Sequence, residues 1–162
     1  MTPLESFPQQ HRQLSALAFD YGTQRIGVAF GQTLTGTAQA IAVLRARDGV
    51  PDWEEVGTLI ERWKPDVFVV GLPYNLDGSD SPLLLRANKF AHRLNGRFHR
   101  PSYGFDERLS SIEAAERILE HGDSQGGQRL SSKRGRGKAT AIDDVAAQII
   151  LENWLGEFAR SR

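Results

Sequence analysis

The sequence predicts one α/β domain in which a mixed five-stranded sheet is flanked by helices. Three short apolar runs follow one another closely near the N-terminus, and helical and strand-like segments alternate after them. Strands so close in the chain pair antiparallel, because a parallel pair needs a long crossover. Helices placed between the later strands cover the sheet. At 162 residues the chain has the length of a single domain.

The expected strands begin with a three-stranded antiparallel meander. Its apolar runs are 14–21, 25–30 and 37–44, separated by turns that contain glycine and threonine. A β-branched run over 66–71 predicts a fourth, buried strand, and residues 101–105 predict a fifth, weaker one.

Two helices are expected between the later strands. The first follows Asp52, a predicted N-cap with Glu55 completing a capping box, and ends before Pro65. The second begins at Ser81, just before a proline, and is closed by Gly96.

Two further helices, over 110–119 and 141–158, are expected on either side of a segment without periodicity. That segment, 123–138, combines four glycines with five basic residues and predicts a flexible basic loop. Residues 1–13 are polar, contain two prolines and lack the apolar stretch of a secretory signal, so they predict a flexible leader. The domain itself is expected over 14–159.

Composition excludes several function classes. The absence of cysteine removes thiol catalysis, disulfide scaffolds and cysteine-based metal sites. Lys and Arg total 20 and Asp and Glu total 20, so a global basic field is absent. No apolar run approaches the roughly 20 residues that cross a bilayer. We therefore expect a cytoplasmic protein with no membrane partner.

Carboxylates stand where the strands of such a sheet end. Asp20 closes the first strand, Asp106 and Glu107 follow the fifth, and Asp143 and Asp144 open the last helix. Ligands bind at the carboxyl ends of strands in sheets of this kind, so these acids can converge. Clustered carboxylates repel one another unless a cation lies among them, and oxygen ligands suit Mg²⁺ or Mn²⁺. Two such ions can activate a water to cleave a phosphodiester.

Each acid also has a plain structural explanation. A carboxylate that closes a buried strand costs solvation, which favours a functional role for Asp20 over a turn role. Glu107 is equally well explained as the partner of Arg108. Acids in a first helical turn are favoured by the helix dipole alone, which accounts for Asp143 and Asp144. The residues by themselves therefore give only weak support for a metal site.

Four segments in register resemble the YqgF (RuvX) family, and the resemblance extends over about 14–155. The segments are FDYGTQRIGVAFG, VVGLPYNLDGSDSP, FDERLSSIEAAE and GKATAIDDVAAQIIL. Members are bacterial RNase H-like proteins, described as Holliday-junction resolvases and as nucleases that mature the 5′ end of pre-16S rRNA. The resemblance implies an RNase H-like fold and hydrolysis of structured RNA such as pre-rRNA, with branched DNA as the alternative substrate.

The resemblance also implies a catalytic acidic triad. Its members would be Asp20, Glu107 and Asp143, which would hold Mg²⁺ or Mn²⁺, two ions when substrate is bound. The residue after Asp143 is also acidic, where the family pattern leads us to expect a small or neutral one. Asp144 is therefore a further candidate ligand, and we favour Asp143.

Other residues are candidates for contacting a nucleic acid. Arg25 in the first hairpin and Arg108 could meet phosphates, and Asn75 could position substrate from the loop after the fourth strand. A surface hairpin and a plain turn explain Arg25 and Asn75 as well. The 123–138 loop supplies the basic set Arg129, Lys133, Arg134, Arg136 and Lys138.

Two other function classes stay open. The DYGT sequence also resembles the phosphate-binding start of actin-like and sugar-kinase ATPases, but those enzymes need a second domain for which this chain has no room. A catalytically silent RNA-binding protein of ribosome assembly would keep the basic loop. Both a monomer and a two-fold homodimer are compatible with the sequence.

Overall fold

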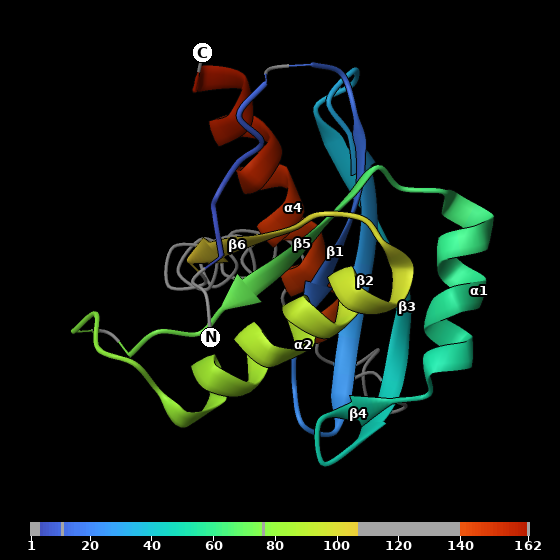
Figure 1. Ribbon diagram of the computed structural model, residues 1–162, viewed down its shortest axis with the longest axis vertical. Helices are drawn as coiled ribbons and strands as arrows, with labels where there is room; N and C mark the ends of the chain where they lie inside the picture. The colour runs from blue at the N-terminus through green and yellow to red at the C-terminus, as the bar shows by residue number, and fades with distance from the viewer. Residues whose placement is uncertain (1–3, 11, 76, 107–139, 162) are drawn as a thin grey trace, which may run out of the picture.

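The computed structural model describes residues 4–10, 12–75, 77–106 and 140–161, with side chains in the last helix described from residue 145 onward. Within these residues the sheet has six strands in the order β4-β3-β2-β1-β5-β6 (Figure 1). The strands are β1 (Ser15–Asp20), β2 (Arg25–Gln32), β3 (Thr37–Arg47), β4 (Val50–Pro51), β5 (Val67–Leu72) and β6 (Ser102–Asp106).

The pairing of the strands follows from their spacing in the chain. β1, β2 and β3 are joined by short turns and pair antiparallel, as predicted. β5 pairs parallel to β1, and β6 pairs parallel to β5. The prediction of five strands is wrong by one, because β4 adds a two-residue edge strand against β3. Two residues, one of them a proline, carry no strand periodicity that a sequence could show.

Helices cover both faces of the sheet. α1 (Trp53–Trp63) and α2 (Pro82–Phe98) pack on one face, and α4 (Thr140–Arg160) crosses the other (Figure 1). The predicted helix over 110–119 and the predicted loop over 123–138 lie outside the described residues. None of the described helices is both long and apolar enough to span a membrane.

α1 begins where the sequence predicts it, with a different cap geometry. The Asp52 carboxylate accepts a hydrogen bond from the backbone N–H of Glu54 at 2.9 Å, which confirms Asp52 as the N-cap. No capping box with Glu55 is seen among the described hydrogen bonds. Lys64 takes a left-handed conformation, and its N–H bonds to the Ile60 carbonyl, so the helix ends before Pro65 as predicted.

α2 runs further than predicted. Ser81 is its N-cap and accepts a hydrogen bond from the Leu84 N–H at 3.0 Å. The helix continues through Gly96 and ends at Phe98, with His99 in the left-handed conformation. Phe98 packs edge-on against Phe68. Burial of the Phe98 ring stabilises the last turn of α2, so the helix does not end at Gly96 as predicted.

Residues 5–7 of the N-terminal segment contact the rest of the fold, and the flexible leader over 1–13 stays a prediction. Trp154 in α4 donates its indole N–H to the carbonyl of Ser6 at 2.7 Å, and the N–H of Gly104 in β6 bonds to the Glu5 carbonyl. The Phe7 ring stacks on Phe158. Apolar side chains in the segment therefore contribute burial that its polar composition conceals.

The two faces of the sheet carry side chains of different size. On the face under α4, β1 and β2 present small residues, including Ala16, Ala18 and Ala29. The face under α1 and α2 carries larger ones, including Phe19 and Phe68. Because side chains alternate along a strand, β1 presents its alanines to α4 and its bulky residues to the other layer.

Candidate active site at the carboxyl edge of the sheet

Asp20 is the last residue of the central strand. Alternation from Ala16 and Ala18 places it on the face of α4, and its side chain is half-buried. β1 and its parallel neighbour β5 both end at this edge, which is where sheets of this kind bind ligands. The structure thus confirms the sequence prediction of a carboxylate at the carboxyl end of the first strand.

Glycines flank Asp20 on both neighbouring strands. Gly27 of β2 lies directly opposite Asp20 in the antiparallel register. On β5, Val70 pairs with Phe19, so Gly71 follows level with Asp20 on the same face. The residues level with Asp20 on both neighbouring strands therefore carry no side chain. We call Asp20 with Gly27 and Gly71 the Asp20 socket.

Of the other acids considered for the site, one lies on the opposite face of the sheet and the rest have side chains outside the described residues. Asp106 ends β6 opposite Leu72, so alternation places it on the α2 face, away from that of Asp20. Asp143 and Asp144 lie in the first turns of α4, and their side chains are outside the described residues, as are Glu107 and Arg108. In the part of the chain that the structure describes, no group of three His, Asp or Glu side chains is placed to hold a metal ion.

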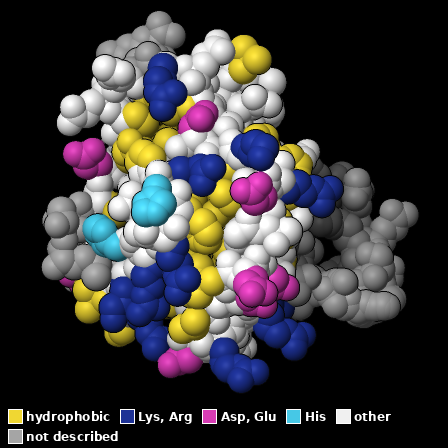
Figure 2. Space-filling model, turned by 45° about the vertical axis from the view of Figure 1, so that its right-hand side comes forward, with side chains coloured by type: hydrophobic (Ala, Val, Ile, Leu, Met, Phe, Trp, Pro, Cys, Tyr) yellow, Lys and Arg dark blue, Asp and Glu magenta, His cyan; other side chains and the backbone are white. Residues whose placement is uncertain are grey.

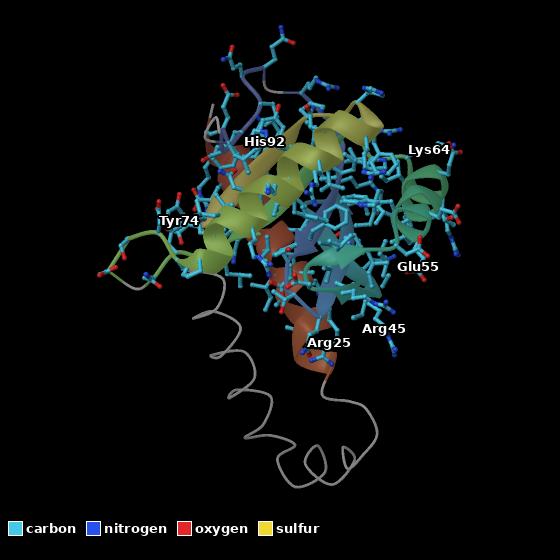
Figure 3. All side chains as sticks on the ribbon, turned by 60° about the horizontal axis from the view of Figure 1, so that its bottom comes forward. Arg25, Arg45, Glu55, Lys64, Tyr74 and His92 are labelled. Atoms are coloured by element: carbon cyan, nitrogen blue, oxygen red, sulfur yellow. The ribbon has the colours of Figure 1, made fainter. Side chains whose placement is uncertain are left out.

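Two arginines face each other beside the socket. Arg25 begins β2 two residues before Gly27, and it pairs across the strands with Arg45 of β3. Both side chains are exposed, and both point to the α4 side of the sheet by alternation (Figure 3 labels them). Like charges directly opposite each other in a sheet are destabilising unless an anion lies between or near them.

Sequence reasoning named Arg25 as a phosphate contact and missed Arg45. The strand runs in the sequence were correct, but a residue's cross-strand partner depends on register. The register here includes an irregularity at Val28 and Ala29. A bulge of this kind shifts which residue of β3 lies opposite Arg25, so only the structure could identify the pair.

Asn75 holds the loop that leaves β5. Its side-chain amide donates to the Ser79 hydroxyl at 3.0 Å and to the Asp80 carbonyl at 3.1 Å. Its backbone N–H bonds to the Ser79 carbonyl, and Gly78 bonds back to Asn75. The turn role is therefore what the described contacts show, and a substrate contact by Asn75 stays a prediction.

Tyr21 fixes the backbone immediately after Asp20. Its buried hydroxyl donates to the Gly49 carbonyl at 3.0 Å, which ties the end of β1 to the turn between β3 and β4. Burial raises the pKa of the Tyr21 phenol above its usual 10, with the nearby guanidiniums of Arg86 and Arg93 opposing the rise. Tyr21 is thus a neutral hydrogen-bond donor at physiological pH.

A hollow of about 520 Å³ opens on the α2 side of the same edge. Leu72 at the end of β5, Tyr74 in the following loop and Leu84, Arg86 and Lys89 of α2 are among the residues that line it. Tyr74 is labelled near the start of α2 in Figure 3. The predicted basic set of the 123–138 loop, Arg129, Lys133, Arg134, Arg136 and Lys138, lies outside the described residues.

Comparison with known proteins identifies relatives over nearly the whole chain. The sequence profile of RuvX, described as Holliday junction resolvase, matches residues 14–157. A protein of Pseudomonas fluorescens Pf-5 named "Putative pre-16S rRNA nuclease" is 49% identical over 143 residues, which is 88% of this chain and 92% of the relative. A Coxiella burnetii protein of the same name is 48% identical over 147 residues, 91% of this chain and 96% of its own.

Solved structures share the fold at low sequence identity. A Thermus thermophilus RuvC in complex with a Holliday junction substrate superposes with a TM-score of 0.51 at 13% identity, over 90% of this chain and 96% of that one. The yeast mitochondrial Holliday junction resolvase Ydc2 gives a TM-score of 0.51 at 13% identity, over 99% and 84%. The expected RNase H-like α/β architecture is confirmed.

Proposed function

This chain belongs to the RuvX family of RNase H-like nucleases, and we propose that it is a divalent-metal-dependent endonuclease that acts in 5′-end maturation of pre-16S rRNA. The family match over 14–157 supports a nuclease, and the names of the relatives support this substrate. The observation that carries the proposal is the Asp20 socket at the carboxyl edge of the sheet. Work on pre-rRNA would place the protein in the cytoplasm.

The socket suits a hard divalent cation. A carboxylate supplies the oxygen donor that Mg²⁺ and Mn²⁺ prefer, and these ions keep room for water and phosphate oxygens. The flanking Gly27 and Gly71 leave that room, since a larger residue at either position would place a side chain beside Asp20. Divalent ions bound there would supply Lewis-acid stabilisation of the phosphate and activation of water.

The positions of the other proposed ligands in the sequence support a site on the α4 face, where Asp20 lies. Glu107 directly follows Asp106, which lies on the α2 face. If the alternation of β6 continues by one residue, Glu107 falls on the α4 face with Asp20. α4 crosses that face, and its first turns carry Asp143 and Asp144. We propose Asp20, Glu107 and Asp143 as the catalytic acids and Asp144 as an additional ligand.

The cationic pair beside the socket would bind the substrate. Arg25 and Arg45 lie opposite each other across β2 and β3, and a phosphodiester carries the negative charge that two neighbouring guanidiniums attract. Arginine presents a planar set of donors that matches phosphate oxygens. These side chains would hold the backbone of the nucleic acid near Asp20, together with Arg108 and the basic loop.

A Holliday junction resolvase is the second candidate function. The description of the RuvX family names that activity, and the fold is shared with resolvases. A resolvase cuts two symmetry-related strands, so this reading predicts a two-fold dimer on branched DNA, whereas cleavage at an RNA end needs only a monomer.

Cleavage assays with an RNA spanning the pre-16S 5′ end and with a four-way DNA junction separate the candidates. Each substrate is tested with Mg²⁺, with Mn²⁺ and with EDTA. We expect RNA cleavage that requires the metal. Cleavage of the junction alone would support the resolvase, and RNA binding without cleavage of either substrate would support a silent binding protein.

Asp20→Asn should abolish cleavage while the fold survives. The change is nearly isosteric but removes the charge that a cation needs, so we expect a loss of at least roughly 100-fold, since even residues behind metal ligands contribute about 10–100-fold. Asp106→Asn is the matched control, because it ends a strand at the same edge on the other face. Wild-type rates for Asp20→Asn would overturn the metal role of this residue.

The two acids of α4 can be ranked by the same assay. The stripe of α4 that faces the sheet includes Ala147, Ile150 and Trp154. At about 100° per residue, helical positions 143 and 144 lie at nearly equal angles on either side of it. The resemblance therefore decides, and we predict that Asp143→Asn is as damaging as Asp20→Asn and that Asp144→Asn is milder.

A further inference from the structure

We propose that a row of four cations on α2 binds the sugar-phosphate backbone of the substrate away from the cleaved bond. The row, here called the basic row, consists of Arg86, Lys89, Arg93 and Arg97. The proposal rests on the nuclease function proposed above, and it concerns a surface on the other side of the sheet from Asp20.

Helix geometry places the four side chains in one line. Their spacing of three, four and four residues keeps them within about 80° of one another around the axis. At about 1.5 Å per residue the row extends over about 16 Å. All four residues are exposed, so the line of charge faces solvent.

The row concentrates charge in a protein whose total charge is zero. α2 contains no aspartate or glutamate between Pro82 and Phe98, whereas α1 and the described part of α4 mix both signs. Figure 2 shows Lys and Arg side chains gathered at the lower left of the face it displays, beside histidine side chains. An uninterrupted row of cations suits a polyanion, because each neutralised phosphate releases counterions.

The row stands on a rigid support. The inner face of α2 is buried through Leu84, Ala87, Phe90, Ala91 and Leu94. Arg86 is held by Asp48 at 3.1 Å, and the Arg97 guanidinium lies 4.4 Å from the centre of the Trp53 ring. Lys89 and Arg93, between them, form no hydrogen bond or ion pair with the described residues. Their charges are therefore available to a ligand.

The row begins at the catalytic edge. α2 follows the loop that leaves the carboxyl end of β5, the parallel neighbour of β1. Arg86 and Lys89 line the hollow that Leu72 and Tyr74 form at that edge. A nucleic acid cut at Asp20 can thus pass over the end of β5 and continue along α2.

The test compares two double variants that remove equal charge. Lys89→Gln with Arg93→Gln neutralises the middle of the row. Arg62→Gln with Arg160→Gln is the control, because both arginines are exposed on helices α1 and α4, outside the row. Dissociation constants for single-stranded RNA, duplex RNA and duplex DNA are measured in EDTA over a series of salt concentrations, and melting temperatures verify folding.

The row variant should bind more weakly and show a flatter salt dependence. Two lost phosphate contacts lower the log–log slope by at most about 1.4 for a single strand and about 1.8 for a duplex. The control variant should keep the wild-type slope. The nucleic acid whose salt slope changes most identifies the backbone that the basic row binds. An unchanged slope for all three nucleic acids overturns the proposal.

The outcome is separable from that of the proposed function. Asp20→Asn should lose cleavage and keep the wild-type salt slope. If the wild-type protein cleaves RNA and the row variant keeps the wild-type salt slope, only the proposal that the basic row binds nucleic acid is refuted. A wild-type protein that binds through the row but cleaves nothing would refute the nuclease proposal alone.

Discussion

The large core side chains come from different elements on the two faces of the sheet. Under α1 and α2 the sheet itself supplies the bulk, and Phe19 and Phe90 meet edge to face at 5.5 Å. Under α4, β1 and β2 supply mainly alanine and glycine, and large side chains come from the helix, where Trp154 and Phe158 stack at 5.3 Å, and from Tyr103 and Phe105 of β6. A sheet surface of small residues lets a helix approach closely.

The difference explains why the chemistry is expected on the α4 face. The small residues of β1 and β2 continue to the carboxyl edge, where Gly27 and Gly71 lie level with Asp20 on the neighbouring strands. The opposite face reaches the same edge with Tyr21 and Leu72, which are buried. The face of β1 and β5 under α2 thus ends in packed side chains, and the α4 face ends in a carboxylate flanked by two glycines.

Phe90→Ala should have the largest effect on stability, confined to the α1/α2 face. Phe90 contacts the rings of Phe19, Tyr21 and Trp53, so truncation leaves a cavity and costs about 3–5 kcal/mol of the free energy of unfolding. Urea denaturation measures the loss. Phe90→Leu should cost less, and the folded fraction of either variant should cleave at the wild-type rate. A folded variant without activity would show that the faces are not separable.

Gly31→Ala should disturb the α4 face in both stability and activity. A Cβ at this position would lie 2.6 Å from the Thr37 carbonyl oxygen and 3.1 Å from a methyl of Leu151, so the strands or α4 must shift. Overpacking of this kind costs about 1–3 kcal/mol. We expect cleavage to fall as well, because α4 carries Asp143.

Gly57→Ala is the matched glycine replacement on the other layer. Its Cβ would meet only the Phe98 ring at 3.6 Å, an ordinary contact, and alanine is favoured over glycine inside a helix by about 1 kcal/mol. Thermal unfolding should show a small gain in stability with unchanged cleavage. A loss of activity from Gly57→Ala equal to that from Gly31→Ala would contradict the assignment of the site to the α4 face.

Tyr103→Phe should have the smallest effect, visible only in alkali. Burial raises the pKa of the Tyr103 phenol above its usual 10, and the nearby Glu5 carboxylate adds to the rise. The folded state then holds the proton more tightly than the unfolded state. This contribution is complete below about pH 10 and is lost as pH rises through the folded pKa. The variant should lose less stability above pH 10 than the wild type, with little difference at neutral pH.

Local patterns in the sequence predicted most of the fold. Strand runs and helix periodicity located every described element except β4 to within about three residues at either end. The end of α2 was predicted wrongly because a tertiary contact decides it: Phe98 extends the helix past Gly96. The bonds from Trp154 and Gly104 to the N-terminal segment are tertiary contacts of the same kind. Neither contact has a signal in the residues near it in sequence.

The sequence predicted single residues of the site better than it predicted which residues lie next to each other. The position of Asp20 follows from a buried run that ends in a charge, and the structure confirms it. That Gly27 and Gly71 flank it, and that Arg45 faces Arg25, depends on strand register, which no single segment contains. The roles of Glu107 and Asp143 stay predictions, since their side chains lie outside the described residues.

The position of α4 in the chain has a consequence for synthesis. Proteins emerge from the ribosome N-terminus first, so every strand of the sheet is made before residues 140–160. Until then Ala16, Ala18 and the other residues under α4 lack the cover of that helix, and an apolar surface of this kind is one that chaperones can bind. Asp143 also arrives with that helix. A nascent chain therefore gains the helix that covers this face and its proposed last catalytic acid in one step, so the proposed catalytic set is incomplete until the last helix has been translated.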